Sequence, residues 1–113
     1  MNLRDEKYIW THHARQKMRH YRLTEARVKR VIRHPARTEE SIVEGAVACM
    51  QPAEGKQYSE IWVMYVLAKT KDEGQKTNAK KMKIITAWRY PGKSPERDPV
   101  PPEILREIRA LIT

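Results

Sequence analysis

The sequence predicts a single α+β domain in which an N-terminal helical hairpin packs on a small antiparallel β-sheet, followed by a C-terminal amphipathic helix. Three observations predict this fold class. Apolar residues recur at helical spacing in the first third of the chain, β-branched and aromatic residues dominate its middle, and a second helical pattern follows a proline-rich stretch near its end. At 113 residues the chain suits one core, because two pieces would each be too small to bury a stable one.

Two short helices are expected near the N-terminus. The first should run from about residue 12 to residue 20, because Thr11 can accept hydrogen bonds from the free amides of the first turn. The second should begin after Thr24 and end near His34, since Pro35 disfavours helical geometry in the residue before it. The expected buried stripes are Ala14, Met18 and Tyr21 in the first helix and Val28, Val31 and Ile32 in the second.

The segments ESIVEGAVACM, EIWVMYVLA and KMKIITAWRY, in the middle of the chain, predict the strands of one antiparallel sheet. EIWVMYVLA is apolar on both faces, so it should be the central strand. The segment KTKDEGQKTNAK is polar and contains a glycine, which predicts a hairpin loop between the last two strands.

The C-terminal part of the chain combines a stiff linker with a helix. Five prolines in PGKSPERDPVPP prevent this segment from continuing a central strand. PEILREIRALIT then places Ile104, Leu105, Ile108, Leu111 and Ile112 on one helical face, which should pack on the protein's own sheet or on a second subunit or partner. We therefore divide the chain into a domain (1–92), a linker (93–102) and a helix (103–113).

The net charge of +9 comes from two basic blocks separated by an acidic one. Residues 11–37 hold nine Lys and Arg residues against one acid, Glu25, and residues 69–93 hold eight against two. If the blocks meet in space they form one cationic surface, which favours nucleic acid as a partner; otherwise they are ordinary solubilising charge. We expect them to meet, with Arg15, Arg19, Lys29, Arg30, Arg33, Lys81 and Lys83 as the residues that bind nucleic acid.

The sequence also indicates a compartment. Cys49 is the only cysteine and has apolar neighbours, so it suits a buried thiol in a reducing environment. The N-terminus lacks the apolar run of a signal peptide, and no apolar run approaches the ~20 residues that cross a membrane. We therefore expect a cytoplasmic protein without membrane contact.

The stretch YIWTHHARQKM raises the question of catalysis. His13, Lys17 and His20 share one helical stripe beside the buried one, at the edge of the core. Metal-free RNA cleavage needs a base, an acid and cations around the phosphate, and imidazole and basic side chains supply all of these. His13 facing Arg89 across a groove would suit this chemistry, whereas a His13 that only bonds a neighbouring carbonyl would be structural. The spacing supports no zinc site, and no metal or cofactor is expected.

YIWTHHARQKM, the following LTEARVKRVIRHP and the late KIITAWRY carry a family resemblance. Over about residues 8–92 the chain resembles a small prokaryotic family, DUF 4258, whose members open with a His-Ala pair, a basic residue and a Met, here His13, Ala14, Lys17 and Met18. The family usually has Arg at the position of Lys17. Its layout is similar to that of the RelE/ParE superfamily of toxin-antitoxin modules, many of which are metal-independent ribonucleases.

The resemblance implies a toxin-like endoribonuclease, or an RNA-binding relative, with His13, Lys17 and Arg89 as its catalytic residues. It implies RNA as the substrate, with an association with the ribosome, and a small acidic antitoxin as a protein partner. A homodimer also fits such a module. The alternative is a small domain without enzymatic activity that acts through protein contacts of its C-terminal helix.

Overall fold

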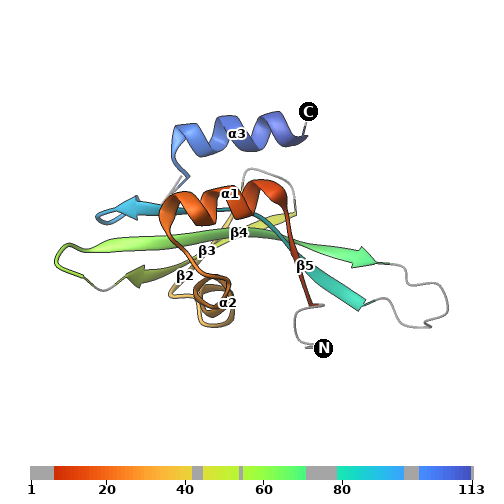
Figure 1. The fold of residues 1–113 in the computed structure, drawn as a ribbon, viewed down its shortest axis with the longest axis horizontal. Helices are drawn as coiled ribbons and strands as arrows, with labels where there is room; N and C mark the ends of the chain where they lie inside the picture. The colour runs from red at the N-terminus through yellow and green to blue at the C-terminus, as the bar shows by residue number, and fades with distance from the viewer. Residues whose placement is uncertain (1–6, 42–44, 54, 71–78, 96–99, 113) are drawn as a thin grey trace.

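The structure, a computed structural model, describes residues 7–41, 45–53, 55–70, 79–95 and 100–112. These form three helices and one five-stranded mixed sheet with the strand order β1-β5-β4-β3-β2 (Figure 1). The central part of the predicted hairpin loop and part of the proline-rich linker lie outside the described residues. The elements are β1 (Tyr8–Trp10), α1 (His12–Tyr21), α2 (Glu25–Arg33), β2 (Arg37–Glu40), β3 (Ala46–Ala53), β4 (Ser59–Thr70), β5 (Ala79–Pro91) and α3 (Pro102–Ile112).

The expected helical hairpin on an antiparallel sheet is wrong in two respects. The sheet is mixed, because β1 precedes the helices and pairs in parallel with β5, for example Tyr8 with Met82. The helices do not form a paired hairpin either: α1 packs on β5 and α2 on β3 and β4, and Figure 1 shows α1 lengthwise but α2 end-on. Three residues are too few to show a strand's alternation, and the partner of β1 lies more than 70 residues away in the sequence.

The helices themselves confirm the boundaries expected from their capping residues. The Thr11 side chain accepts a hydrogen bond from the Ala14 amide at 3.1 Å, and Thr24 accepts one from the Arg27 amide at 3.1 Å. The Thr11 hydroxyl also donates to the Ile84 carbonyl of β5 at 2.7 Å. One residue therefore caps α1 and attaches it to β5 of the sheet.

The sheet separates two apolar cores, and β4, the predicted central strand, contributes to both. Its Ile61 and Val63 pack with α1 and α2 on one face, while Trp62 and Met64 pack with α3 on the other. Figure 1 shows α2 and α3 on opposite sides of the sheet. Because α3 buries Ile104 and Ile108 in this second core, its apolar face packs on the protein's own sheet. Among the residues that the structure describes, no helix is long and apolar enough to cross a membrane.

A β-bulge in β5 changes which side chains face the first two helices. Tyr65 pairs with Ile84 and Met64 with Thr86, so Ile85 is an extra residue on β5. Before the bulge, Met82 and Ile84 face the core of α1 and α2; after it, Ala87 does. This shift of one residue puts Arg89 on the same face as α2, because side chains alternate along a strand.

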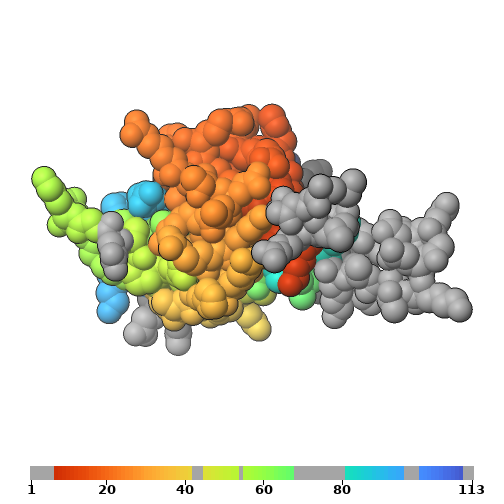
Figure 2. All heavy atoms as spheres, turned by 60° about the horizontal axis from the view of Figure 1, so that its bottom comes forward, coloured from red at the N-terminus to blue at the C-terminus, as the bar shows by residue number. Residues whose placement is uncertain are grey.

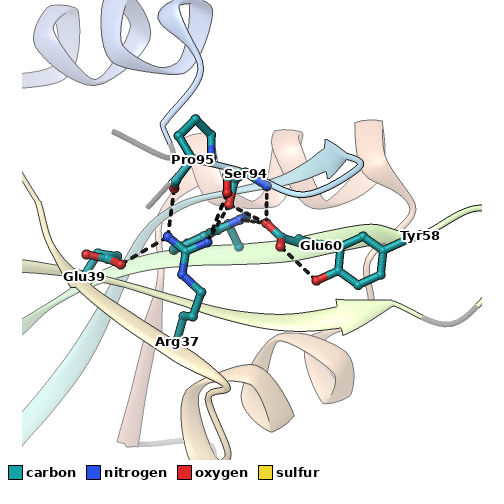
Figure 3. Close-up of polar contacts among 7 residues, drawn as sticks. Arg37, Glu39, Tyr58, Glu60, Ser94 and Pro95 are labelled. Atoms are coloured by element: carbon teal, nitrogen blue, oxygen red, sulfur yellow. Dashed lines mark hydrogen bonds and ion pairs between the residues drawn. The ribbon is translucent and has the colours of Figure 1, made fainter. Parts of the chain in front are cut away.

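A buried carboxylate anchors the segment between β5 and α3 (Figure 3). Glu60 is 1% exposed and accepts hydrogen bonds from the Trp62 indole at 3.1 Å, from the Ser94 amide at 3.1 Å and from the Tyr58 hydroxyl at 2.9 Å. Burial raises the pKa of Glu60, but these bonds and one from the Ser94 hydroxyl outweigh it and hold the pKa below its ordinary value. Arg37 donates to Ser94 Oγ at 2.8 Å and to the Pro95 carbonyl at 2.9 Å.

Candidate nucleic-acid interface

Four arginines line one hollow beside the turn between α1 and α2, which we call the arginine pocket: Arg22, Arg27, Arg30 and Arg89. Its volume is about 680 Å³, which is within the range of about 300–1,000 Å³ typical of ligand sites. The rest of its lining is apolar or neutral: Leu23, Thr24, Gln51, Pro52, Ala53 and Ile61. No acidic side chain of the described residues lines it.

Each arginine reaches the pocket for a local reason. Arg22 follows the last turn of α1 in the left-handed conformation, with φ of 57°, which residues other than glycine seldom adopt. Arg27 and Arg30 are three residues apart on α2, so they lie on neighbouring turns of one helical face. Arg89 joins them because the bulge in β5 turns it toward α2.

Among the described residues, the acceptors that hold Arg27 and Arg89 in the arginine pocket carry no negative charge. Arg27 donates to Gln51 Oε1 and to the Pro52 carbonyl, and Arg89 donates to the Tyr21 carbonyl at 3.4 Å and to Ser59 Oγ at 3.5 Å. All four acceptors are uncharged. Burial lowers the pKa of Arg27, and the charges of Arg30 and Arg89 lower it further. Arg30 and Arg89 are thus close enough to Arg27 to repel its charge.

The surface around the pocket is also basic. Figure 2 shows α1 and α2, in orange, as one continuous surface on this face of the molecule. Arg19 of α1 and Arg33 of α2 are exposed, while Arg15 forms an ion pair with Glu25 at 3.0 Å. Lys29 lies over the Tyr8 ring at 5.2 Å.

The two basic blocks meet only in part. Arg89 of the second block joins Arg27 and Arg30 of the first in the arginine pocket. Lys81 and Lys83 alternate with Met82 and Ile84, which pack against the first core, so both lysines point toward the opposite face. They therefore do not extend the cationic surface of α1 and α2.

His13 and Lys17 belong to a separate site, which we call the histidine cluster. They line a hollow of about 370 Å³ with Gln16, His20 and Glu107, between α1 and α3. Lys17 Nζ is 2.8 Å from Glu107 Oε1, and His13 Nε2 is 3.5 Å from Glu107 Oε2. Burial lowers the pKa of His13; Glu107 acts in the opposite direction, and Lys17 lowers it again. The result favours a neutral imidazole and a lysine whose charge is balanced by a carboxylate.

The three expected catalytic residues are therefore not brought together. His13 and Lys17 face Glu107 of α3, whereas Arg89 lines the arginine pocket, and neither hollow contains all three. The histidine cluster has an acid, a base and a cation, but its cation already holds a carboxylate at ion-pair distance. The arginine pocket has cations, but its described lining includes no histidine, carboxylate or thiol that could serve as an acid or base. The arginine pocket is therefore the better candidate site for an anion.

Sequence reasoning missed Arg22 and Arg27. The pattern of α2 contained a signal for Arg27, because it lies one position before Val28 of the buried stripe and three before Arg30. Glu107 was missed as well, because its role depends on where α3 packs. Cys49 is buried, and burial raises its pKa to about 12, so its thiol is not a nucleophile near neutral pH. Across the described ranges no three His, Cys, Asp or Glu side chains form a group suited to a metal ion.

Comparison of the chain with protein-family models, with curated proteins and with solved structures gave no significant match.

Proposed function

We propose that this protein binds RNA through the arginine pocket and the basic surface of α1 and α2, as a cytoplasmic RNA-binding relative of toxin-type ribonucleases. One observation carries the proposal: four arginines line a single hollow in which none of the described lining residues is acidic. Guanidinium groups match the oxygens of a phosphate with two parallel hydrogen bonds. Folding brings these like charges together, and a bound polyanion would relieve their repulsion.

The proposal concerns binding rather than cleavage. Cleavage of RNA without a metal requires an acid or base within hydrogen-bond reach of the bound phosphate. The histidine that could do this, His13, lines a different hollow from Arg89 and has its Nε2 atom directed at Glu107. The alternative role, in which the C-terminal helix binds a protein, is weakened because Ile104 and Ile108 of α3 are already buried in this molecule.

Binding of a short single-stranded RNA with hydroxyl groups at both ends, measured over a range of salt concentrations, tests the proposal. If four arginines each contact a phosphate, the logarithm of the binding constant should fall against the logarithm of salt with a slope of about −3, from about 0.7 per contact. Uncharged competitor molecules should not reduce the amount of RNA bound. If the protein does not bind this RNA, or if its affinity does not change with salt, the proposal that it binds RNA through these arginines is wrong.

A further inference from the structure

The arginine pocket holds four positive charges, more than the single negative charge of one internal RNA phosphodiester can balance. An internal phosphodiester carries one negative charge and two free oxygens. A phosphate monoester carries about 1.5 to 2 negative charges near neutral pH and three free oxygens. Four arginine forks around one hollow offer more hydrogen-bond donors than the two free oxygens of a diester can accept.

We propose that the arginine pocket binds a terminal phosphate monoester of an RNA in preference to its internal phosphodiesters. This inference rests on the proposed function, because it names the part of the RNA that the pocket recognises. The basic surface of α1 and α2 would then hold the adjoining backbone, while the pocket holds the chain end.

The backbone of Arg22 supports this assignment independently of charge. The residue closes α1 at φ 57°, where its amide donates to the carbonyls of Arg19 and Met18. Glycine is the usual residue in this conformation because it has no Cβ to clash. An arginine held there is strained, and strained residues cluster at sites that bind ligands. Here the strained residue lines the pocket with three other arginines.

Two buried apolar residues line the pocket together with its arginines. Leu23 is 7% exposed and Ile61 is 3% exposed, and both line the hollow together with the arginines. Apolar walls lower the local dielectric constant, which strengthens hydrogen bonds between ions. Arg27 is held by Gln51 and by the Pro52 carbonyl, so its fork is already oriented when a ligand arrives.

The test compares three versions of one ten-nucleotide RNA: hydroxyl groups at both ends, a 5′-phosphate, and a 3′-phosphate. Fluorescence anisotropy, with the dye attached to an internal base, gives the affinity of the full chain for each. The unaltered protein should bind at least one phosphorylated form tenfold more tightly than the hydroxyl form. The preferred end then identifies which terminus enters the pocket.

Two variants separate the pocket from general charge. Arg22→Gly suits the backbone at φ 57° and should keep the fold, yet it should reduce the preference for the phosphorylated end to threefold or less. Arg106→Gln removes one charge from the exposed face of α3 and should leave the preference unchanged.

Three results would overturn the inference. Equal affinity for the three RNAs would leave RNA binding intact but remove the role of the terminal phosphate. Competition by adenosine monophosphate at the concentration at which phosphorylated RNA competes would show that the pocket takes a free nucleotide. Failure to bind any of the three RNAs would contradict both this inference and the proposed function.

Discussion

The arginine pocket and the histidine cluster take most of their basic residues from the N-terminal part of the chain, yet only the arginine pocket keeps its positive charge available. In the histidine cluster, Lys17 lies 2.8 Å from the carboxylate of Glu107. In the arginine pocket, Arg27 and Arg89 donate hydrogen bonds only to neutral acceptors among the described residues. The net charge of a segment therefore does not by itself determine whether it can bind an anion. That also depends on whether other elements of the fold place carboxylates next to its basic side chains.

The two regions also depend on different parts of the fold. The histidine cluster exists only while α3 is docked, since Glu107 lies on that helix between the buried Ile104 and Ile108. The anchor of Glu60, Ser94 and Arg37 holds the chain that leads to it. The arginine pocket instead depends on the turn after α1 and on the bulge in β5. Each region can therefore be altered without the other.

The largest effect is expected when the carboxylate of the histidine cluster is removed. Glu107→Ala leaves Lys17, whose side chain is 17% exposed, without its ion-pair partner. Because this pair is neither fully exposed nor fully buried, we expect a loss of about 2 kcal/mol in the free energy of unfolding. Urea denaturation measures it. Glu103→Ala, an exposed position on the same helix, should change stability far less, and equal losses in both variants would argue against the ion pair.

A single change in the arginine pocket should affect binding without affecting stability. Arg30 is exposed, and its side chain forms no hydrogen bond or ion pair with another described residue. Arg30→Gln should weaken RNA binding about tenfold, the effect of one lost bond to a charged group, and should change the free energy of unfolding by less than about 0.5 kcal/mol. Arg106→Gln is the control of equal charge. Equal weakening by the two variants would mean that net charge, not the pocket, binds RNA.

Replacing Arg22 should change stability and RNA binding in opposite directions. Arg22→Gly removes a side chain from a left-handed position, so the free energy of unfolding should rise by about 1 kcal/mol while RNA binding weakens. Arg19→Gly, inside α1, should instead lower stability by about 1 kcal/mol. Thermal and urea unfolding of both variants would check this. A stability loss in Arg22→Gly would contradict the strain assigned to this residue.

The smallest effect concerns the pH dependence of the histidine cluster. Burial lowers the pKa of His13 in the folded protein below the ordinary value of 6.5, so the unfolded chain binds the proton more readily. His13 should therefore cost stability as the pH falls through 6.5 toward its folded pKa, and His13→Gln should remove that loss. Urea denaturation of both proteins at pH 7.5 and pH 5.5 measures it. If the unaltered protein and His13→Gln lose the same amount of stability between pH 7.5 and pH 5.5, the effect of Glu107 on the pKa of His13 fully offsets the effect of burial.

His13→Gln also separates the two readings of this histidine. If His13 is structural, the substitution should change stability and leave any RNA cleavage unaffected. If it is an acid or base, cleavage should fall by about 100-fold or more with little change in stability. The contact with Glu107 favours the structural reading.

The parts of the fold that sequence predicted well are local. Thr11 and Thr24 defined the starts of α1 and α2 because a capping side chain acts within three residues, and the two-sided apolar pattern of β4 identified the central strand. The parallel β1 was missed because three residues show no period. The orientation of the last helix was left open because its apolar face fits either its own sheet or a partner.

The candidate site depended on events that sequence patterns do not encode. Arg89 shares one face of β5 with Ala87, and the bulge at Ile85 decided that this face is the one that packs toward α2. His13 was expected to face a groove at the sheet, and instead it faces Glu107, which is 94 residues away in the sequence. Alternation and helical spacing predict which residues share a face. They do not predict which other element covers that face.

The slope of RNA affinity against salt tests the central claim most directly, because it counts phosphate contacts. The double variant Arg22→Gln, Arg30→Gln should reduce the slope by about 1.4, from two lost contacts of about 0.7 each. Lys17→Gln, which alters the histidine cluster, should leave the slope unchanged, because that lysine already holds Glu107. A slope unchanged by the double variant, or one reduced as much by Lys17→Gln, would contradict the assignment of RNA binding to the arginine pocket.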